Sequence, residues 1–382
     1  YNNYKINIYY KEVIPLPIII GNLSFDLCKF TLPKLTYNEN KNTIGIPLAH
    51  FVKPKNLIII DNILNQVHLI DISNNRDKSI KDIEKLKNII NNEKSILKNT
   101  KVKSFNKKFK PLMSKKSFLK KVNLIKDEIT KGEIFQAVLS QRFENDYKID
   151  PFNFYRALRS INPSPYLVYL NFSEYQIICS SPETMIKIND DLVTLRPIAG
   201  TRKRGKTKEE DEFNRNELLN DKKELAEHLM LVDLGRNDVG TISQIDSVKV
   251  TEKNIVEYYS HVMHIVSNVT GKIKKKLSPI DVLFAGLPAG TVSGAPKIRA
   301  LQILEELENN NREFYAGSVC YLDANGNMDS CINLRTALIK DKKIYAQSGA
   351  GIVYDSEDIS EYDECINKAQ ALFNAYSIAH EI

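Results

Sequence analysis

The sequence lacks a long apolar run. A helix that crosses a bilayer needs about 20 consecutive apolar residues, and the most apolar stretch, Val13 to Ile20, is short and interrupted by Pro15 and Pro17. The first residue is Tyr1, and no charged head, apolar core and cleavage site follow it as in a secretory signal. We therefore expect a cytoplasmic protein, and the missing initial methionine leads us to expect that an N-terminal piece is absent.

Cysteine is scarce in the chain. The five cysteines are odd in number and far apart, and most have apolar neighbours: Cys28, Cys179, Cys320, Cys331 and Cys365. This pattern is typical of reduced, buried thiols rather than of disulfides or zinc ligands. None of the five lies in a Gly-x-Cys-x-Gly segment, so no amidotransferase nucleophile is present to release ammonia from glutamine.

Most of the chain lacks a net positive charge. The net charge is +7, but the segment from Lys98 to Lys121 contains ten lysines and no acidic residue, and subtracting these ten charges leaves −3. Such a local run is typical of a solvated linker. Nucleic-acid binding is the weaker interpretation.

The chain of 382 residues exceeds the usual size of one hydrophobic core, which predicts two domains or one large two-layer body. Short strands are expected before residue 73, including Leu57 to Ile60 and Val67 to Ile72. A segment rich in Asn and Lys follows, with one helical stretch over residues 80–90. We therefore divide the chain into an N-terminal β-rich layer with a linker, 1–116, and a catalytic region, 117–382.

The region after residue 116 has the denser pattern. Strands are expected over residues 134–143, 166–170, 176–179 and 185–188. Helices are expected from Asp221 to Gly235, from Pro296 as first helical residue, and near Ser360, the first with an Asp-x-x-Glu capping pattern. Long antiparallel strand runs with few amphipathic helices indicate an α+β fold.

Two predicted helices carry carboxylates three residues apart. Glu224 and Glu227 form one pair, and Glu361 and Glu364 form the other. Oxygen ligands from two helices could hold Mg²⁺ and leave positions for water and an anion. From spacing alone, solvated surface pairs without a metal remain the alternative.

The segment from Leu287 to Lys297 is rich in glycine and small residues. Its two glycines allow close backbone approach, Thr291 and Ser293 offer hydroxyls, and the start of the following helix could attract an anion. The order of a P-loop is absent. A glycine-rich turn without a ligand stays the alternative.

Other single residues could bind or react. Gly349 and Gly351 follow a predicted strand, and Tyr315 and Arg335, on neighbouring predicted strands, could clamp a carboxylate. His264 alternates with apolar residues on a predicted strand, where a satisfied core histidine is the alternative.

Glu183 lies between two predicted strands. A partly buried carboxyl at such a position could stay protonated and act as an acid, although loop glutamates are commonly solvated.

These segments, in this order, resemble the chorismate-utilising enzymes over roughly residues 117–376. The resemblance rests on nine ordered blocks: Gly132 to Gln136, Ser181 to Glu183, Arg196 to Thr201, Asp221 to Asp238, His264, Pro288 to Lys297, Tyr315 to Tyr321, Gly349 to Val353, and Glu361 to Ala369. It implies two large antiparallel β-sheets packed as a sandwich with helices outside, and an active site in a cleft.

The resemblance also implies roles for individual residues. Glu227 and Glu364 would bind Mg²⁺, supported by Glu224 and Glu361, and the metal would hold the ring carboxylate of chorismate. Gly200, Thr201 and Gly349 would line that side, whereas Tyr315, Arg335 and the Gly351 backbone would hold the enolpyruvyl carboxylate. Glu183 would be the general acid, assisted by His264 and Thr291.

Two positions separate the branches of this family. Water-adding members, which make isochorismate or salicylate, carry a lysine where this chain has Gln136, and members that make aminodeoxychorismate carry one where it has Ala199. The resemblance therefore favours the branch that makes anthranilate from chorismate and ammonia, with a separate glutamine amidotransferase subunit as partner. Those other branches, and a non-catalytic binding homologue, are the alternatives.

A candidate allosteric segment comprises Asn162, Pro163, Ser164, Pro165 and Tyr166. It resembles one half of the tryptophan site of feedback-inhibited relatives, and an ordinary turn is the alternative. The other half, an N-terminal Leu-Glu-Ser type segment, is not found in the sequence. We therefore expect weak inhibition by tryptophan or none.

Overall fold

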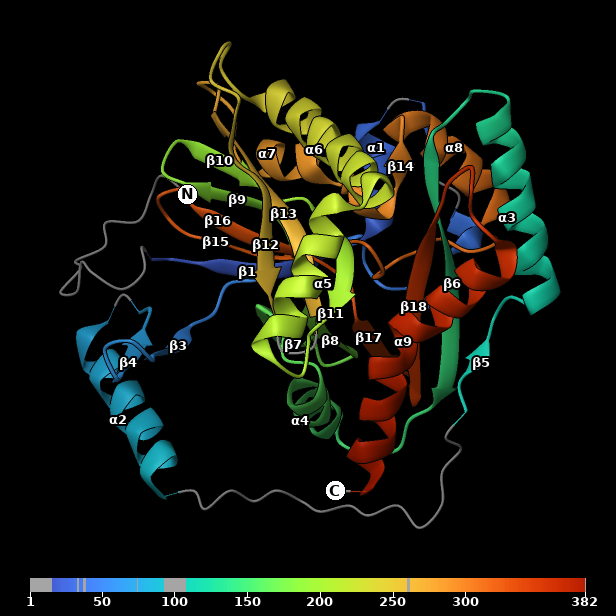
Figure 1. Ribbon diagram of the computed structural model, residues 1–382. Coiled ribbons are helices and arrows are strands. Elements are labelled where there is room, and N and C mark those ends of the chain that lie inside the picture. The colour runs from blue at the N-terminus through green and yellow to red at the C-terminus, as the bar shows by residue number, and fades with distance from the viewer. Residues whose placement is uncertain are drawn as a thin grey trace.

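The chain forms two large antiparallel sheets with helices outside them (Figure 1). The computed structural model describes residues 16–32, 34–36, 39–73, 75–92, 108–259 and 262–381. One sheet has nine strands in the order β11-β13-β10-β9-β16-β15-β1-β2, with β12 also paired to β13. Its strands are β1 (Ile19–Leu23), β2 (Ala49–Val52), β9 (Thr184–Asn189), β10 (Leu192–Leu195), β11 (Ile198–Lys203), β12 (Lys249–Tyr258), β13 (Val262–Lys272), β15 (Ser318–Leu322) and β16 (Met328–Ile332).

The second sheet has seven strands in the order β14-β6-β18-β17-β8-β7, with β5 also paired to β6. Its strands are β5 (Lys110–Pro111), β6 (Gln136–Asp146), β7 (Tyr166–Asn171), β8 (Tyr175–Ser181), β14 (Gly294–Ala295), β17 (Thr336–Lys340) and β18 (Lys343–Ile352). A separate hairpin pairs β3 (Asn56–Asp61) with β4 (Gln66–Asp71). The expected α+β sandwich is confirmed.

Helices cover the outer faces of both sheets. Those on the nine-stranded sheet are α5 (Lys208–Asn220), α6 (Lys222–Ile242) and α7 (Pro279–Gly286), and those on the seven-stranded sheet are α3 (Lys115–Thr130), α4 (Pro151–Ile161), α8 (Lys297–Leu307) and α9 (Asp358–Glu381). The other helical elements are α1 (Cys28–Thr31), α2 (Arg76–Asn92), η1 (Phe25–Leu27), η2 (Glu39–Lys41) and η3 (Gly290–Val292). No helix in the described ranges combines the length and apolarity required to cross a membrane.

Strand β8 shows how the sandwich is packed. Ile177 and Cys179 face the nine-stranded sheet, where Cys179 contacts Val319 and Cys331, whereas Ile178 packs under α4 and α9. Successive side chains of a strand point to opposite faces. Because both faces of β8 are buried, the apolar residues Ile177, Ile178 and Cys179 follow one another instead of alternating with polar ones.

Most elements lie where the sequence predicted them, and two helix boundaries differ. Helix α6 begins after the expected cap Asp221, whose carboxylate accepts two backbone N–H groups, but it continues through Gly235 to Ile242. Gly235 lies inside the helix and does not end it. Its missing side chain allows close packing on a strand, since an added Cβ would lie 3.0 Å from Leu195. Pro296 precedes α8 as its cap instead of being its first residue.

The remaining expectations about the N-terminal region have mixed outcomes. The two predicted strands and the helical stretch near residue 80 are confirmed as β3, β4 and α2. All five cysteines of the chain are buried free thiols, as expected. The predicted linker is described only in part, because residues 93–107 lie outside the described ranges. Strands β1 and β2 extend the nine-stranded sheet, with β1 paired directly to β15.

The contact between β1 and β15 depends on the absence of a side chain at Gly317. An added Cβ there would lie 2.2 Å from the carbonyl oxygen of Leu23 and 2.9 Å from the amide nitrogen of Phe25. We expect Gly317→Ala to lower the free energy of unfolding by about 1–3 kcal/mol through overpacking. Urea unfolding monitored by circular dichroism measures this change.

Gly240 provides the matched control. It lies in α6, is exposed, and an added Cβ would meet no atom within 4 Å. Gly240→Ala should therefore leave the protein unchanged or stabilise it by up to about 1 kcal/mol. Equal effects of the two substitutions would show that β1 is not packed on β15 in this way.

Candidate active site

The candidate active site lies where the chain crosses from one sheet to the other. Glu183 lies between β8 of the seven-stranded sheet and β9 of the nine-stranded sheet, and Arg335 lies on the return crossing between β16 and β17. The amide of Ser180 donates to the carbonyl of Arg335 (3.2 Å), and the amide of Ile332 donates to the carbonyl of Glu183 (3.1 Å). These two hydrogen bonds place the carboxyl and guanidinium groups in the same region.

The expectation that Tyr315 and Arg335 lie on neighbouring strands is wrong. Tyr315 precedes β15, and Arg335 has a left-handed backbone conformation with φ of +46° in the turn before β17. A non-glycine residue with positive φ is uncommon in a strand and frequent in turns and functional sites. Both side chains are therefore presented by connections between strands.

Burial raises the pKa of Glu183 to about 7. The hydroxyl of Thr291 and the charges of Arg335 and Lys368 oppose this shift. Although Thr291 acts on the carboxyl in this way, its buried Oγ1 has no hydrogen bond of good geometry in the described part of the chain. Glu183 is thus partly protonated near neutral pH, as a general acid requires.

Arg335 and Tyr315 have polar groups available for a ligand. Within the described ranges neither side chain makes a hydrogen bond or an ion pair, and burial lowers the pKa of the guanidinium and raises that of the phenol. The Tyr315 hydroxyl lies 3.1 Å from the position that a Cβ on Gly349 would take. An incoming carboxylate would supply the acceptor that a partly buried guanidinium requires.

Gln136 and Gly351 are neighbours on β6 and β18. The Gln136 amide donates to a carboxylate oxygen of Glu227 (3.1 Å), and a Cβ on Gly351 would lie only 2.7 Å from the Gln136 Nε2 atom. A side chain at position 351 would therefore displace the amide from Glu227. The sequence predicted that Gly349 and Gly351 follow a strand. Both lie within strand β18, because this strand extends to Ile352.

The four predicted metal-ligand carboxylates belong to two helices that face the same region. Burial, together with the charges of Glu224 and Glu364, raises the pKa of Glu227, and burial and Glu364 raise that of Glu361. Repulsion among hard oxygen donors of this kind is relieved by a cation such as Mg²⁺, so the donor set fits that ion.

Two of these carboxylates are paired with cations of the protein. Glu224 contacts Arg202 (3.0 Å) and Glu364 contacts Lys368 (2.6 Å). Among the described residues no group of three or more potential ligands already stands in a metal-binding arrangement. A Mg²⁺ ion would therefore compete with the Lys368 ammonium group for the Glu364 carboxylate.

His264 lies on β13, as expected, with Gly200 and Thr201 on the neighbouring strand β11. Its Nδ1 atom lies 3.0 Å from the Gly200 carbonyl oxygen and 3.1 Å from the Thr201 hydroxyl. Burial lowers the pKa of the imidazole, which favours the neutral ring. A ring that donates from Nδ1 to the carbonyl keeps Nε2 as a proton acceptor. Gly200 also lies close to the Glu224 carboxylate, because a Cβ added to Gly200 would be 3.3 Å from the Oε2 atom of Glu224.

Lys368 is a site residue that the sequence did not reveal. Its ammonium group donates to the Gly349 carbonyl (3.1 Å), pairs with Glu364, and lowers the pKa of Glu183, Glu227 and Glu361. Its position one helical turn after Glu364 was the available signal, but such pairs are common on any exposed helix.

The candidate allosteric segment forms the turn between α4 and β7. The Asn162 side chain donates to the Ser180 hydroxyl (3.0 Å), next to the crossing that carries Glu183, and the Tyr166 hydroxyl donates to Asp329 (2.8 Å). Pro163 and Pro165 are exposed and Ser164 is half-buried. Tryptophan binding by this segment stays a prediction.

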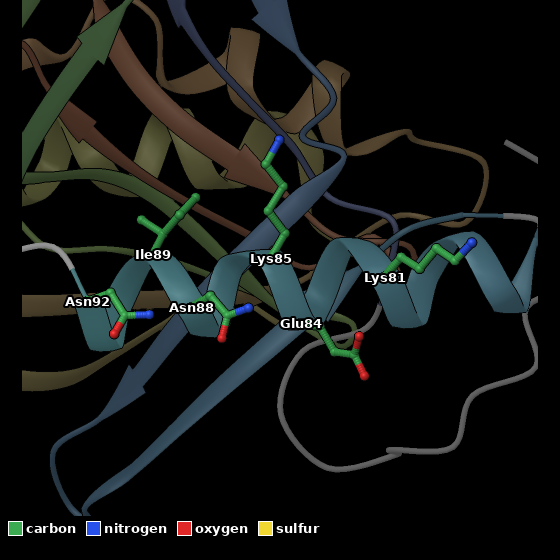
Figure 2. A pocket seen from close by; sticks show the side chains of 6 residues that line it. All are labelled: Lys81, Glu84, Lys85, Asn88, Ile89 and Asn92. Atoms are coloured by element: carbon green, nitrogen blue, oxygen red, sulfur yellow. The ribbon is translucent and has the colours of Figure 1, made fainter.

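An open hollow elsewhere has no counterpart among the predicted site residues. Figure 2 shows its lining side chains, all from α2: Lys81, Glu84, Lys85, Asn88, Ile89 and Asn92. No acid, guanidinium and hydroxyl converge there as they do around Glu183.

Comparison with known proteins gives a consistent result. A family model described as chorismate binding enzyme matches residues 4–374. Anthranilate synthase component 1 of Acetivibrio thermocellus is 45% identical over 95% of this chain and 76% of that protein. The protein of the same name from Cereibacter sphaeroides is 56% identical, but the match covers 66% of this chain and 51% of that protein.

Solved structures extend the comparison to three dimensions. The crystal structure of anthranilate synthase component I from Streptococcus pneumoniae TIGR4 superposes with a TM-score of 0.86 at 38% identity, covering 96% of this chain and 82% of that one. The described structure therefore has the sandwich of that protein as well as its sequence pattern. The chain belongs to the family of chorismate-binding enzymes, in the group that contains the anthranilate synthase component 1 proteins.

Proposed function

We propose that this chain is the large subunit of an anthranilate synthase, which aminates chorismate with ammonia and then eliminates pyruvate to form anthranilate. The observation that carries the proposal is the position of Glu183, an acid with a pKa of about 7, beside the Arg335 guanidinium, which has no hydrogen-bond or ion-pair partner among the described residues. The anthranilate synthase component 1 relatives support the same reaction.

The two carboxylates of chorismate would bind at opposite ends of this site. Arg335 and Tyr315 would hold the enolpyruvyl carboxylate, because their polar groups have no partner among the described residues. Glu227 and Glu364 would hold Mg²⁺, with Glu224 and Glu361 in support. The bound cation would neutralise the ring carboxylate and the negative charge around it.

Glu183 would then act on the leaving group. Ammonia attacks the ring, and the ring hydroxyl departs as water with the proton of Glu183. His264, neutral and with Nε2 as acceptor, and Thr291 assist around the ring. Gln136 supplies no base to activate water, and position 199 is alanine, so neither water addition nor a lysine adduct has its required group.

The direct test is a mixture of purified chain, chorismate, Mg²⁺ and an ammonium salt, monitored by anthranilate fluorescence. Appearance of anthranilate and pyruvate in equal amounts supports the proposal. Accumulation of aminodeoxychorismate or isochorismate instead would assign the chain to another branch of the family.

The carboxylate pairs generate the first functional prediction. Glu227→Gln and Glu364→Gln should each lower turnover by at least about 100-fold, because the charge stabilisation supplied by a metal ion amounts to several kcal/mol. The free energy of unfolding should change by no more than about 1 kcal/mol. The exposed Glu306 on α8 gives the control, and Glu306→Gln should keep full activity. Normal turnover of both site variants at limiting Mg²⁺ would rule out the metal assignment.

The pKa of Glu183 generates a pH prediction. The acid is active when protonated, so kcat/KM for chorismate, measured at a constant concentration of free ammonia, should fall as pH rises through about 7. The hydroxyl of Thr291 lowers this pKa. Thr291→Val should therefore move the decline to higher pH, whereas Glu183→Gln should lose about 100-fold or more in rate. A shift to lower pH in Thr291→Val would contradict this arrangement.

The nitrogen source provides an independent prediction. Because no cysteine of this chain stands in an amidotransferase context, the purified chain should form anthranilate from ammonium at alkaline pH and not from glutamine. We propose that a separate glutamine amidotransferase subunit supplies ammonia, and adding such a subunit should restore the use of glutamine. Glutamine-dependent synthesis by the pure chain alone would be incompatible with this division of roles.

A further inference from the structure

A buried ion pair lies beside the active site without being part of it. Arg312 is 1% exposed, and its Nε and Nη2 atoms donate to the two carboxylate oxygens of Glu308, each at 2.8 Å. Its remaining donors reach two backbone carbonyls, with Nη1 2.6 Å from Val292 and Nη2 2.6 Å from Val138. The guanidinium therefore joins three separate parts of the chain.

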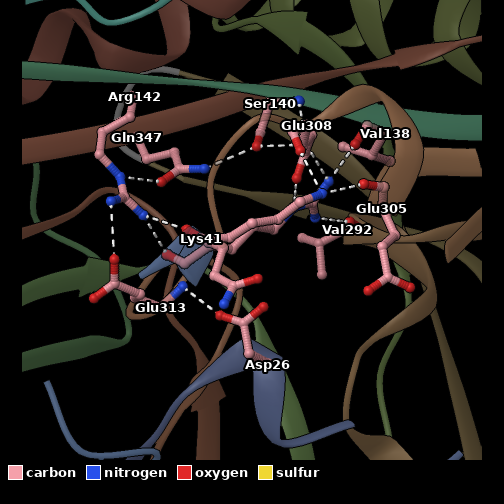
Figure 3. Close-up of polar contacts among 12 residues, drawn as sticks. Asp26, Lys41, Val138, Ser140, Arg142, Val292, Glu305, Glu308, Glu313 and Gln347 are labelled. Carbon is pink, nitrogen blue, oxygen red and sulfur yellow. Dashed lines mark hydrogen bonds and ion pairs between the residues drawn. The ribbon is translucent and has the colours of Figure 1, made fainter. Parts of the chain in front are cut away.

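Those carbonyls belong to segments that carry site residues. Val292 directly follows Thr291 in the glycine-rich loop, and Val138 lies on β6 two residues after Gln136. Figure 3 shows Val292 and Val138 close to Glu308, which also accepts hydrogen bonds from the amide (3.0 Å) and hydroxyl (2.8 Å) of Ser140. The ion pair thus ties the loop with Thr291 to the strand with Gln136.

Arg312 also acts on Tyr315. The Tyr315 amide donates to the Arg312 carbonyl (3.2 Å), and the guanidinium carbon lies 5.7 Å from the centre of the phenol ring. Its charge opposes the rise that burial causes in the pKa of that phenol. The Arg312 side chain therefore lies over the Tyr315 ring and holds the residue after Thr291, while the Arg312 backbone carbonyl holds the Tyr315 amide.

Stability alone is a weak reason for this pair. Removing two charges from water costs several kcal/mol per ion, and replacing a buried pair by neutral groups of similar size is often tolerated. We propose that Arg312, held by Glu308, is a positioning residue that sets the places of Thr291 and Tyr315 relative to Glu183. Its effect on turnover rests on the proposed function, whereas its effect on the loop does not.

A second buried pair offers a control for the contact with the loop, since its Arg142 also donates to the Arg312 carbonyl (3.0 Å). Arg142 and Glu313 are each 3% exposed and lie 3.1 Å apart, and Glu313 accepts the backbone amides of residues 43–45. Figure 3 shows Arg142 connected to Ser140 through Gln347. Within the described chain this pair makes no hydrogen bond to the loop of residues 288–297.

The experiment compares two double substitutions in the full chain, Arg312→Met with Glu308→Gln and Arg142→Met with Glu313→Gln. Hydrogen exchange of the amides in residues 289–295 and the steady-state kcat and KM with ammonium are measured for both. The first pair should accelerate exchange in this loop and lower kcat by about 100-fold, since small displacements of catalytic groups have effects of this size. The control pair should leave loop exchange within about threefold of the original chain at the same folded fraction, and should lower kcat less than the first pair does.

The single substitution Arg312→Lys separates positioning from folding. Lysine keeps the charge beside Glu308 but lacks the planar set of donors, so kcat should fall to between the values of the original chain and the double variant. This variant serves as the test if the double variant does not fold. Normal kcat in Arg312→Lys, or unchanged loop exchange in the folded double variant, would overturn the proposal.

The two readouts also distinguish the proposal from the function on which it rests. If the original chain forms no anthranilate, the proposed function fails, and loop exchange still decides whether Arg312 holds residues 289–296. Equal losses of kcat in both double variants at the same folded fraction would show that the effect is general destabilisation, and would also overturn the proposal.

Discussion

The site depends on two backbone hydrogen bonds that join the crossings between the sheets. The amide of Ser180 meets the carbonyl of Arg335, and the amide of Ile332 meets the carbonyl of Glu183. A chain segment that leaves one sheet for another loses its strand partners, so its buried N–H and C=O groups need other hydrogen bonds. Here the two crossings supply these hydrogen bonds to each other. An acid and a cation therefore come together between two packed sheets.

Burial then gives these side chains their chemical properties. Removal from water raises the pKa of Glu183 to about 7 and lowers that of the Arg335 guanidinium. A partly buried cation without a protein partner is costly in isolation and is satisfied when an anion binds. At the other end of the site, the clustered carboxylates on α6 and α9 have the opposite requirement and favour a cation. A substrate with two carboxylates, together with Mg²⁺, would satisfy both ends.

Much of this fold was predictable from local patterns. The apolar runs identified the central strands, and the capping residue Asp221 identified the start of α6, because these signals depend on nearby residues. The end of α6 was not predictable, because Gly235 looked like a helix terminator. It is a glycine because the helix packs closely against Leu195 of strand β10, and this contact is not visible in the local sequence. The turn position of Arg335 likewise follows from the exchange between sheets, which no local pattern encodes.

The predicted site residues lie in one region of the structure, but the contacts that hold them there were not predicted. Ordered motifs selected the acid, the carboxylates and the glycines as candidates, whereas spacing alone left each with a plausible structural alternative. Lys368 was missed because its pairing with Glu364 looks like an ordinary helix surface. The Arg312 and Glu308 pair was missed because its partners, Val138 and Val292, are contacted through backbone carbonyls, which have no sequence signature.

The most direct test of the account is the position of bound substrate. A crystal structure of the Glu183→Gln variant with chorismate and Mg²⁺ would show it without turnover. The account predicts the enolpyruvyl carboxylate within about 3 Å of both the Arg335 guanidinium and the Tyr315 hydroxyl, with the ring hydroxyl facing residue 183. Chorismate bound elsewhere, with Arg335 left without an anion, would contradict it.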